Sequence, residues 1–452
     1  MDRIIEDGLW ELKGRIEEIV GEVASGLSPR SLSEFEHELH GALGALGRTV
    51  EKAVLEGADV EQPCLEHEGA RHYWKYKGPQ EYQCLFGKIE VRRSIYQANG
   101  QKTLCPLEVN AGLLHHHLTP AAAEFVAFST AHMVPAELAE FCRRFQFLTP
   151  SETVIKQVAA DVGDISEMLA EIYEERIHNE EPAVKGACVV AFSRDGTCVN
   201  VREEGWRQAQ VGAISHYGKK TKNAEGEAER KRLRSVYQGQ MPEEKTVTFD
   251  EKFEREVDRT LSNLSRRTVL ACIADGARSN WNYFERHPRL KHAVHINDFW
   301  HAAQYLSKAS DALFGEATAK GQRWFRKYRR ILKTEDGAVE QVIRSIRYYR
   351  KNLKIRSAQR LEKIRSVLRY FTRNRERMHY ADYRRRGLPI GSGVVEAACK
   401  TLVGHRLKRA GMRWSIDGGQ SILNLRAVVL SRRWDYFWSC HQDALAIHRV
   451  AA

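Results

Sequence analysis

The sequence predicts a multidomain protein: an α/β core with a mixed sheet is interrupted by an all-helical insertion and preceded by a small β element and helix-turn-helix-like helices. Three observations predict this class. The chain has 452 residues, too many for one hydrophobic core. Apolar strand-like runs and an amphipathic helical pattern alternate between residues 186 and 301. The next eighty residues or so show only helical patterns.

The composition excludes several classes of protein. Hydrophobic residues make up 42% of the chain, as in a folded globular protein. No run of 18 apolar residues occurs, and the acidic, amphipathic N-terminus is not the pattern of a secretory signal. The 9 cysteines stand singly, without a C-x-x-C pair, which predicts reduced thiols and a cytoplasmic protein. The formal charge of +12 favours a polyanionic partner, because Lys and Arg that neutralise phosphates release counterions.

Two segments open the chain. Residues 1–57 have apolar positions at helical spacing and predict two helices, either a hairpin packed on the body or a dimerisation element. Residues 58–117 predict a small β-rich element with a hairpin around Gly87. A zinc ribbon would need closely paired ligands, and Cys64 and His67 are the one close pair, since Cys84 and Cys105 have no close mates. We therefore favour ordinary β residues over a zinc site here.

Residues 118–180 predict a helix-turn-helix-like, DNA-binding region. Three short helices are expected to start at Thr119-Pro120, at Pro135 and at a capping box over Thr149-Pro150-Ser151-Glu152. Compact helix triplets are also common outside DNA-binding proteins, so both interpretations remain open. The residues expected to face phosphate are Arg143, Arg144 and Lys156.

Residues 181–301 predict the first part of the core. We expect a buried strand up to Arg194, an Asp-Gly turn, a second strand, and a third strand in the stretch WRQAQVGAISHY. Residues 217–247 are highly charged and predict an insertion. An amphipathic helix then leads to two apolar strands, one ending before Asp275 and the other before Asp298.

Residues 302–386 predict a basic helical insertion. From Lys320 to Arg386 there are 23 Lys and Arg against 6 Asp and Glu, a net charge of +17. A solvated helical face is the usual explanation of a charge run, but this concentration favours a surface that faces DNA. The residues that we assign to it are Arg323, Arg326, Lys327, Arg329 and Arg330.

Residues 387–452 predict the return to the core. The glycine-rich break Gly391-Ser392-Gly393 precedes a helix in which Glu396 occupies the first turn, and further helices follow. Glu396 thereby joins Asp195 and Asp275, each of which follows an apolar strand. In an RNase H-like sheet those two strands are neighbours, so a late helix packed there would bring three carboxylates together.

Three such carboxylates suit phosphodiester chemistry. Two Mg²⁺ ions, for which Mn²⁺ can substitute, activate the attacking oxygen and stabilise the leaving one, and hard cations take carboxylate ligands. We expect Asp195 to bridge both ions. Singly, each acid has an ordinary explanation as a turn residue or as an acid at a helix N-terminus. The joint pattern of two strand-end acids, a basic helical insertion and an acid on a capped helix favours catalysis.

Asp298 and His301 form an accessory pair. Asp298 follows a strand and either caps the next helix or stands near the metals, with His301 on the same helix face. Other chemistries have less support, because no tyrosine stands out as a recombinase nucleophile and no P-loop motif is present.

The C-terminal motifs carry a family resemblance. The stretches PIGSGVVEAACKTLVGHRLKRAGMRWS and LRAVVLSRRW resemble the signature of bacterial insertion-sequence transposases of the ISKra type, relatives of the Mutator-like DDE group. IADGARSNW and NDFWHAAQYL resemble the second-Asp and Asp-x-x-His motifs of the same family. The resemblance covers roughly residues 185–440. By position it implies the triad Asp195, Asp275 and Glu396.

The resemblance implies an RNase H-like fold and a Mg²⁺-dependent transposase of the bacterial nucleoid, which cuts double-stranded DNA at terminal inverted repeats and joins it to target DNA. Such an enzyme would pair two DNA ends as a homodimer or larger assembly. Within the C-terminal signature we assign Arg406, Lys408 and Arg409 to DNA binding. The alternatives are a catalytically inactive, domesticated DNA-binding protein and a metal-dependent structure-specific nuclease.

Overall fold

The computed structural model describes residues 2–24, 26–113, 115–145, 148–224, 226, 228–447 and 450. It is a mixed α/β structure with two sheets, which confirms the predicted combination of α/β and helical parts. The chain divides into two compact units: Met1–Asn179 with Asn424–Ala452, and Glu180–Leu423. Among the described residues, every helix is too short or too polar to traverse a lipid bilayer.

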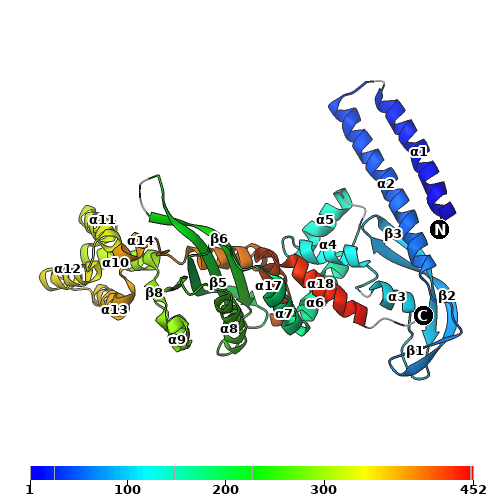
Figure 1. The fold of residues 1–452 in the computed structure, drawn as a ribbon. Helices are drawn as coiled ribbons and strands as arrows, with labels where there is room; N and C mark the ends of the chain where they lie inside the picture. Colours follow the sequence, from blue (N-terminus) through cyan, green and yellow to red (C-terminus); the bar gives the residue numbers. More distant parts are fainter. Residues whose placement is uncertain are drawn as a thin grey trace. The chain divides into compact units, whose positions relative to one another are not determined.

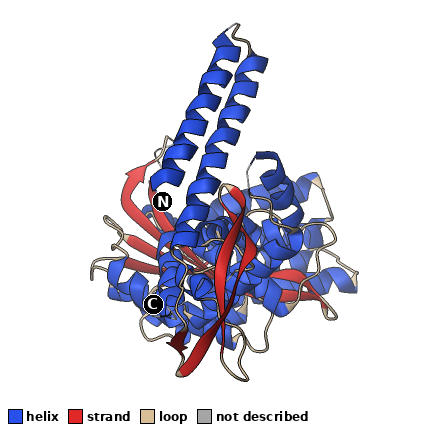
Figure 2. Ribbon diagram, turned by 90° about the vertical axis from the view of Figure 1, so that its right-hand side faces the viewer, coloured by secondary structure: helices blue, strands red, loops and turns tan. Residues whose placement is uncertain are grey.

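The first unit joins helices to a small antiparallel sheet. Two long helices lie side by side in Figures 1 and 2, and the second begins at the N-cap Ser28, whose hydroxyl accepts a bond from Ser31 N. The sheet has the order β1-β2-β3, and the turn of its β2–β3 hairpin ends at Gly87, close to the predicted position. The elements are α1 (Asp2–Ala24), α2 (Pro29–Gly57), β1 (Cys64–His67), β2 (Ala70–Cys84), β3 (Gly87–Gln97), α3 (Pro106–Ala111), α4 (Pro120–Thr130), α5 (Pro135–Phe145), α6 (Glu152–Met168), α7 (Ala170–Glu180) and α18 (Trp434–Ile447).

The three predicted helices of residues 118–180 are present as α4, α5 and α6. The third starts later than expected: its N-cap is Ser151 rather than Thr149, and the Ser151 hydroxyl accepts a bond from Val154 N at 3.2 Å. The stretch 387–452, predicted as one part of the core, divides between the units. Its last helix packs within the first unit, where Trp434 Nε1 donates to Glu124 at 2.9 Å.

The second unit is built on a five-stranded sheet of order β6-β5-β4-β7-β8. Strands β4, β5 and β6 are antiparallel neighbours, whereas β7 is parallel to β4 and β8 is parallel to β7. The strands are β4 (Val189–Val201), β5 (Gly205–Lys222), β6 (Ala228–Gln240), β7 (Val269–Ala274) and β8 (Val294–Asn297).

Helices cover both faces of this sheet. Alternate residues of β4 face opposite sides: Val190 and Phe192 pack with α8 and α9, whereas Val189 and Ala191 pack with α10 and the helices that follow it. The helices of this unit are α8 (Val247–Ser262), α9 (Arg278–Arg286), α10 (Phe299–Phe314), α11 (Ala319–Thr334), α12 (Ala338–Asn352), α13 (Ala358–Asn374), α14 (Tyr380–Arg385), α15 (Gly393–Ala398), a π-helix (Cys399–Gly404) and α16 (His405–Leu407), and α17 (Ile416–Leu430) crosses into the first unit.

Two strand predictions were wrong. Asp195-Gly196 forms no turn, because β4 runs on through both residues, which lie opposite Val211 and Gln210 of β5. The charged stretch 217–247 is not an insertion, because it holds the end of β5 and the whole of β6. Strand β6 lies at the edge of the sheet, where charged side chains reach solvent without disturbing the pairing.

Candidate metal centre

Three acids stand at one level across three neighbouring parallel strands: Asp195 lies in β4, Asp275 directly follows β7, and Asp298 directly follows β8. Ser193 of β4 lies opposite Ile273 of β7, so the register continued by two residues brings Asp195 beside Asp275. Ala274 lies opposite Asn297 of β8, so one further residue brings Asp275 beside Asp298. The N–H of Asp298 still donates to Ala274 O at 2.8 Å. Neighbouring strands are about 4.8 Å apart, so the three acids form one row across the sheet.

Asp195 of the predicted triad lies within β4 and is partly buried. Its Oδ1 accepts a bond from Gly196 N at 2.7 Å, and the thiol of Cys399 lies 3.8 Å from its Oδ2. Burial raises the pKa of Asp195, and the charges of Asp275 and Glu396 raise it further. Burial also raises the pKa of Cys399 to about 12, so this thiol is protonated and donates to the carboxylate. The three predicted acids are therefore close enough to interact electrostatically.

Asp275 is held by the start of α9. Its Oδ1 accepts bonds from Ala277 N at 3.0 Å and from Asn280 Nδ2 at 3.3 Å. The same Asn280 nitrogen lies 3.2 Å from Arg194 O, which ties the loop after β7 to β4. Trp281 Nε1 donates to Asp275 O at 2.8 Å. These contacts fix the carboxylate next to Asp195.

Asp298 is the N-cap of α10, as the simpler of the two predictions had it. Its Oδ1 accepts a bond from His301 N at 2.6 Å, and its Oδ2 accepts bonds from the backbone and the hydroxyl of Ser392. Burial acts to raise the pKa of Asp298, but the neighbouring His301 side chain and these hydrogen bonds outweigh it and lower the pKa. Because both oxygens are engaged, Asp298 positions the loop that leads to α15.

Ser392 connects that loop to Glu396. The hydroxyl oxygen of Ser392 lies 2.8 Å from Asp298 Oδ2 and 2.9 Å from Glu396 Oε1. One hydroxyl carries one proton, so it donates to one carboxylate at a time. Ligand atoms of Asp298, His301 and Glu396 all lie within 4.8 Å of one another. Asp195 and Asp275 are not in this tight group, so the predicted triad surrounds the centre without converging on one point.

His301 faces this acidic group. Its Nδ1 lies 3.6 Å from Asp298 Oδ1, which is too long for a hydrogen bond, and this buried atom has no hydrogen-bond partner among the described residues. The carboxylate of Asp298 raises the pKa of His301, and Asp275 and Glu396 add to the effect. His301 therefore favours its charged form among the carboxylates.

The residues fit a hard divalent cation. Four carboxylates, those of Asp195, Asp275, Asp298 and Glu396, gather around a single histidine. The shared proton of Ser392 leaves one neighbouring carboxylate without its hydrogen bond. Oxygen ligands and an excess of negative charge are what Mg²⁺ and Mn²⁺ require. Asp195, Asp275 and Glu396, the three acids of the predicted triad, would hold such ions, with Asp298 and His301 beside them.

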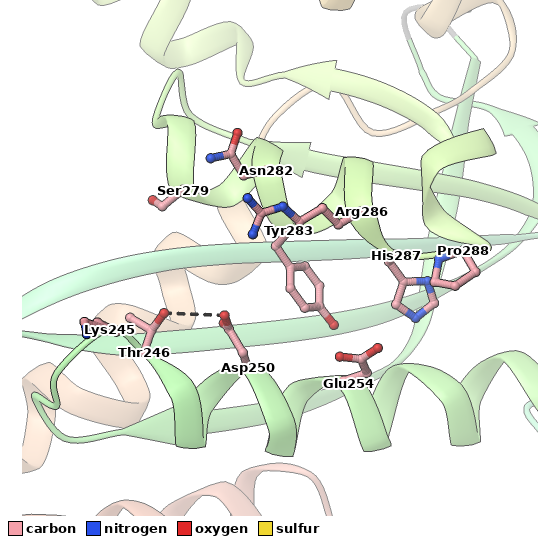
Figure 3. Close-up of a pocket in the computed structure, with 10 residues that line it drawn as sticks. All are labelled: Lys245, Thr246, Asp250, Glu254, Ser279, Asn282, Tyr283, Arg286, His287 and Pro288. Carbon is pink, nitrogen blue, oxygen red and sulfur yellow. Dashed lines mark hydrogen bonds between the residues drawn. The ribbon is translucent and has the colours of Figure 1, made fainter.

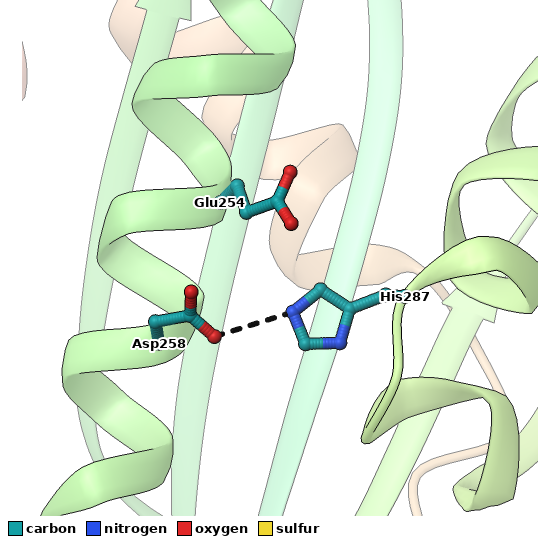
Figure 4. Close-up of side chains that lie close together, drawn as sticks. All are labelled: Glu254, Asp258 and His287. Atoms are coloured by element: carbon teal, nitrogen blue, oxygen red, sulfur yellow. Dashed lines mark ion pairs between the residues drawn. The ribbon is translucent and has the colours of Figure 1, made fainter.

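A second group of possible ligands lies between α8 and α9. A cavity of about 400 Å³ there is lined by both helices, and Glu254, Asp258 and His287 come within 4.8 Å of one another (Figures 3 and 4). However, Nδ1 of His287 accepts bonds from Arg289 N and Leu290 N, both at 3.3 Å. In the neutral ring the proton then lies on Nε2, 3.4 Å from Asp258 Oδ1. That nitrogen then has no lone pair for a metal, so this second group fits a metal ion less well than the carboxylates around His301 do.

The cysteines of the small β element do not form a comparable site. Cys84 and Cys105 are buried and pack into the apolar core beneath the hairpin. Within the part of the chain that the structure describes, Cys64, His67, Cys84 and Cys105 belong to no group of ligands close enough to share a metal.

The predicted DNA-binding residues differ in exposure. In the first unit, Arg143 and Lys156 are exposed but pair with Glu140 and Glu152 on their own helices, and Arg144 is exposed. On α11, Arg323, Arg326, Lys327 and Arg330 are exposed, and the guanidinium of Arg329 lies 5.3 Å from the centre of the Trp300 ring.

The C-terminal basic residues separate into two kinds. Lys408 and Arg409 are exposed, and the ammonium of Lys408 is bonded to the Thr197 hydroxyl, two residues beyond Asp195. Arg406 is 2% exposed and lies over the Trp414 ring, so its assignment to a DNA-facing surface was wrong. A run of basic residues does not show which of them lies on the buried side of a helix, and in the structure Arg406 lies on that side.

Comparison with known proteins assigns no family: a scan against protein-family models finds no match for this chain, and a search of curated proteins finds no significant relative.

The sequence analysis did not identify Ser392 and Cys399 as functional residues. The signal for both was their spacing from Glu396, four residues before it and three after it, which places all three on one helical face.

Removal of the Ser392 hydroxyl should loosen Glu396 without unfolding the protein. We expect Ser392→Ala to raise the Mg²⁺ concentration needed for half-maximal binding by about 10- to 100-fold, as for other residues that orient metal ligands. A Mg²⁺ titration of the melting temperature measures this, with Ser279→Ala, an exposed serine on α9, as the matched control. An unchanged midpoint would show that the hydroxyl does not orient Glu396.

Proposed function

We propose that this chain is a DNA transposase that uses Asp195, Asp275 and Glu396 for metal-dependent cleavage at transposon ends and for strand transfer into target DNA. The observation that carries the proposal is the row of acids on three parallel strands, with Glu396 tied to that row through Ser392. The motifs that resemble bacterial DDE transposases supply these same acids.

The sheet supports an RNase H-like core. Numbered within this sheet alone, its strands have the order 3-2-1-4-5, with the first three antiparallel and the last two parallel to the first. That arrangement places the first and fourth strands side by side, as the catalytic acids of an RNase H-like enzyme require. The helices α10 to α14 lie between the second Asp and the Glu.

Each side chain of the site has a separate role in the proposed mechanism. Bound Mg²⁺ would activate the attacking oxygen and stabilise the leaving oxygen of an in-line displacement at phosphorus. Asp195 and Asp275 offer oxygens from neighbouring strands, and Glu396 offers one from α15. Asp298 fixes the loop before α15 by accepting the bond from Ser392 N, and the Ser392 hydroxyl lies between Asp298 and Glu396. His301 places a positive charge near the position where the scissile phosphate would bind.

The charge distribution supports double-stranded DNA as the partner. The net +17 between Lys320 and Arg386 lies on helices whose apolar residues, such as Trp324 and Leu332, are buried and whose basic residues are exposed. The exposed Lys408 lies beside β4 near Asp195. Transposon ends and target DNA are long polyanions that match such a surface. Pairing of two ends would require at least a homodimer.

The decisive test is Glu396→Gln, assayed for cleavage and joining of end-containing DNA with Mg²⁺. We expect loss of both activities and retention of DNA binding, and the matched control is Glu244→Gln at an exposed position. Activity retained by Glu396→Gln would overturn the mechanism. Cutting without joining by the natural protein would point instead to a structure-specific nuclease, and binding without cutting to a domesticated DNA-binding protein.

A further inference from the structure

A basic groove begins next to the metal centre and runs along α13. Its volume is about 900 Å³, and Gly276, which directly follows Asp275, forms part of its wall. Four arginines also line it: Arg350, Arg365, Arg369 and Arg373. None of these four is among the predicted DNA-binding residues.

The positive charge of the groove is only partly neutralised. Its one acid, Glu362, bonds to Arg365 at 3.1 Å and to Arg369 at 2.9 Å. Among the described residues, no hydrogen bond or ion pair engages the exposed guanidinium groups of Arg350 and Arg373. These two arginines are therefore available to a negatively charged ligand.

Aromatic rings form the inner wall of the groove. The rings of Tyr305 and Tyr370 stack in parallel, with centroids 3.7 Å apart and 3° between their planes. The Tyr370 hydroxyl is fixed by Asn297 Nδ2 at 2.7 Å, and Leu368 adds apolar surface. The two rings cover each other, and the ammonium of Lys308 lies 4.5 Å from the centre of the Tyr305 ring, so the wall offers apolar edges rather than a ring face. Arginines beside an apolar wall suit a nucleic-acid strand, whose phosphates are charged and whose bases are largely apolar.

The groove is joined to the catalytic loop by close packing. A Cβ added at Gly276 would lie 2.6 Å from Tyr370 Cε2 and 3.3 Å from Asn374 Nδ2. The loop that carries Asp275 therefore lies directly against α13. A strand whose phosphate reaches the metal centre would pass over Gly276 into the groove.

We infer that this groove binds an unpaired stretch of the DNA strand that is being cut, with its phosphates on Arg350 and Arg373 and its bases along the apolar edge formed by Tyr305 and Leu368. The inference rests on the proposed function and adds the form of the substrate. Pockets of about 300–1,000 Å³ hold molecules of the size of a few nucleotides, so the groove suits one strand rather than a duplex. DNA ends would then have to open beside the cleavage position.

The test compares two double variants in binding experiments without metal. Arg350→Ala with Arg373→Ala removes the free groove arginines, and Arg347→Ala with Lys363→Ala removes two exposed charges from the same helices outside the groove. The probes are a labelled oligothymidine and a labelled duplex, each titrated at several salt concentrations.

We expect the groove variant to bind oligothymidine at least about tenfold more weakly, with a salt slope smaller by about 1.4, and to bind the duplex almost normally. Equal losses for both probes, no loss, or the same loss in the control variant would overturn the inference. Because no metal is present, this result is independent of the Glu396→Gln cleavage assay. Failure of the groove would leave that assay unchanged, and failure of the triad would leave these binding constants unchanged.

Discussion

Asp275→Asn should reduce Mg²⁺-dependent DNA cleavage by about a thousandfold or more, because a bound metal contributes several kcal/mol to the stability of the transition state. The asparagine keeps the oxygen that accepts the Ala277 and Asn280 bonds, so the loop should hold its shape. Single-turnover cleavage of end-containing DNA measures the loss.

The same variant should be at least as stable as the natural protein without metal. Burial raises the pKa of Asp195, and the charge of Asp275 raises it further, because the two carboxylates repel each other. Removal of one charge should therefore raise the free energy of unfolding by up to about 1 kcal/mol. Added Mg²⁺ should raise the melting temperature of the natural protein but not that of the variant. Equal stabilisation of both by Mg²⁺ would contradict the assignment of Asp275 as a ligand.

The second large effect concerns duplex binding by α11. Replacement of four of its exposed basic residues by Ala should lower the affinity for double-stranded DNA by about a hundredfold or more and reduce the salt slope by about 3 to 4, because each neutralised phosphate contributes about 0.9. Fluorescence anisotropy over a range of salt concentrations measures both quantities. The four residues are Arg323, Arg326, Lys327 and Arg330.

A control with the same change in net charge comes from the opposite end of the parallel strands. Four exposed basic residues lie just before β7 and β8, away from the row of acids. If their replacement by Ala weakened binding as much as the α11 variant, general charge rather than the α11 face would explain the affinity. These residues are Arg266, Arg267, Arg289 and Lys291.

The local sequence correctly predicted two strands of the core and the helices of the insertion. The apolar runs before Asp275 and Asp298 are short, which is typical of buried strands. The structure has β7 and β8 there, and both acids directly follow these strands as expected. The helical insertion was also predictable, because its apolar residues recur at helical spacing even among many charges.

Other features depend on contacts between distant residues and could not be predicted. Asp195-Gly196 is a dipeptide that is common in turns, but pairing with β5 keeps it extended. The sequence of β6 is as highly charged as a surface loop. It forms a strand because it pairs with β5 at the edge of the sheet, and this partner is not apparent from the local sequence. The bridge from Asp298 through Ser392 joins residues 94 positions apart, and nothing local to Ser392 marks its partner.

The π-helix that follows Glu396 sets the length of this segment. Its Cys399 lies against Asp195, and Lys408, just past α16, bonds to Thr197 on the same strand. In a π-helix each hydrogen bond spans five residues instead of the four of an α-helix, so the turn contains one additional residue. A lineage that lost one residue between these contacts could close the turn into a regular α-helix, but Lys408 would then rotate by about 100° away from β4. Insertions and deletions here are thus constrained by the strand that carries Asp195, although most of these residues never touch a metal.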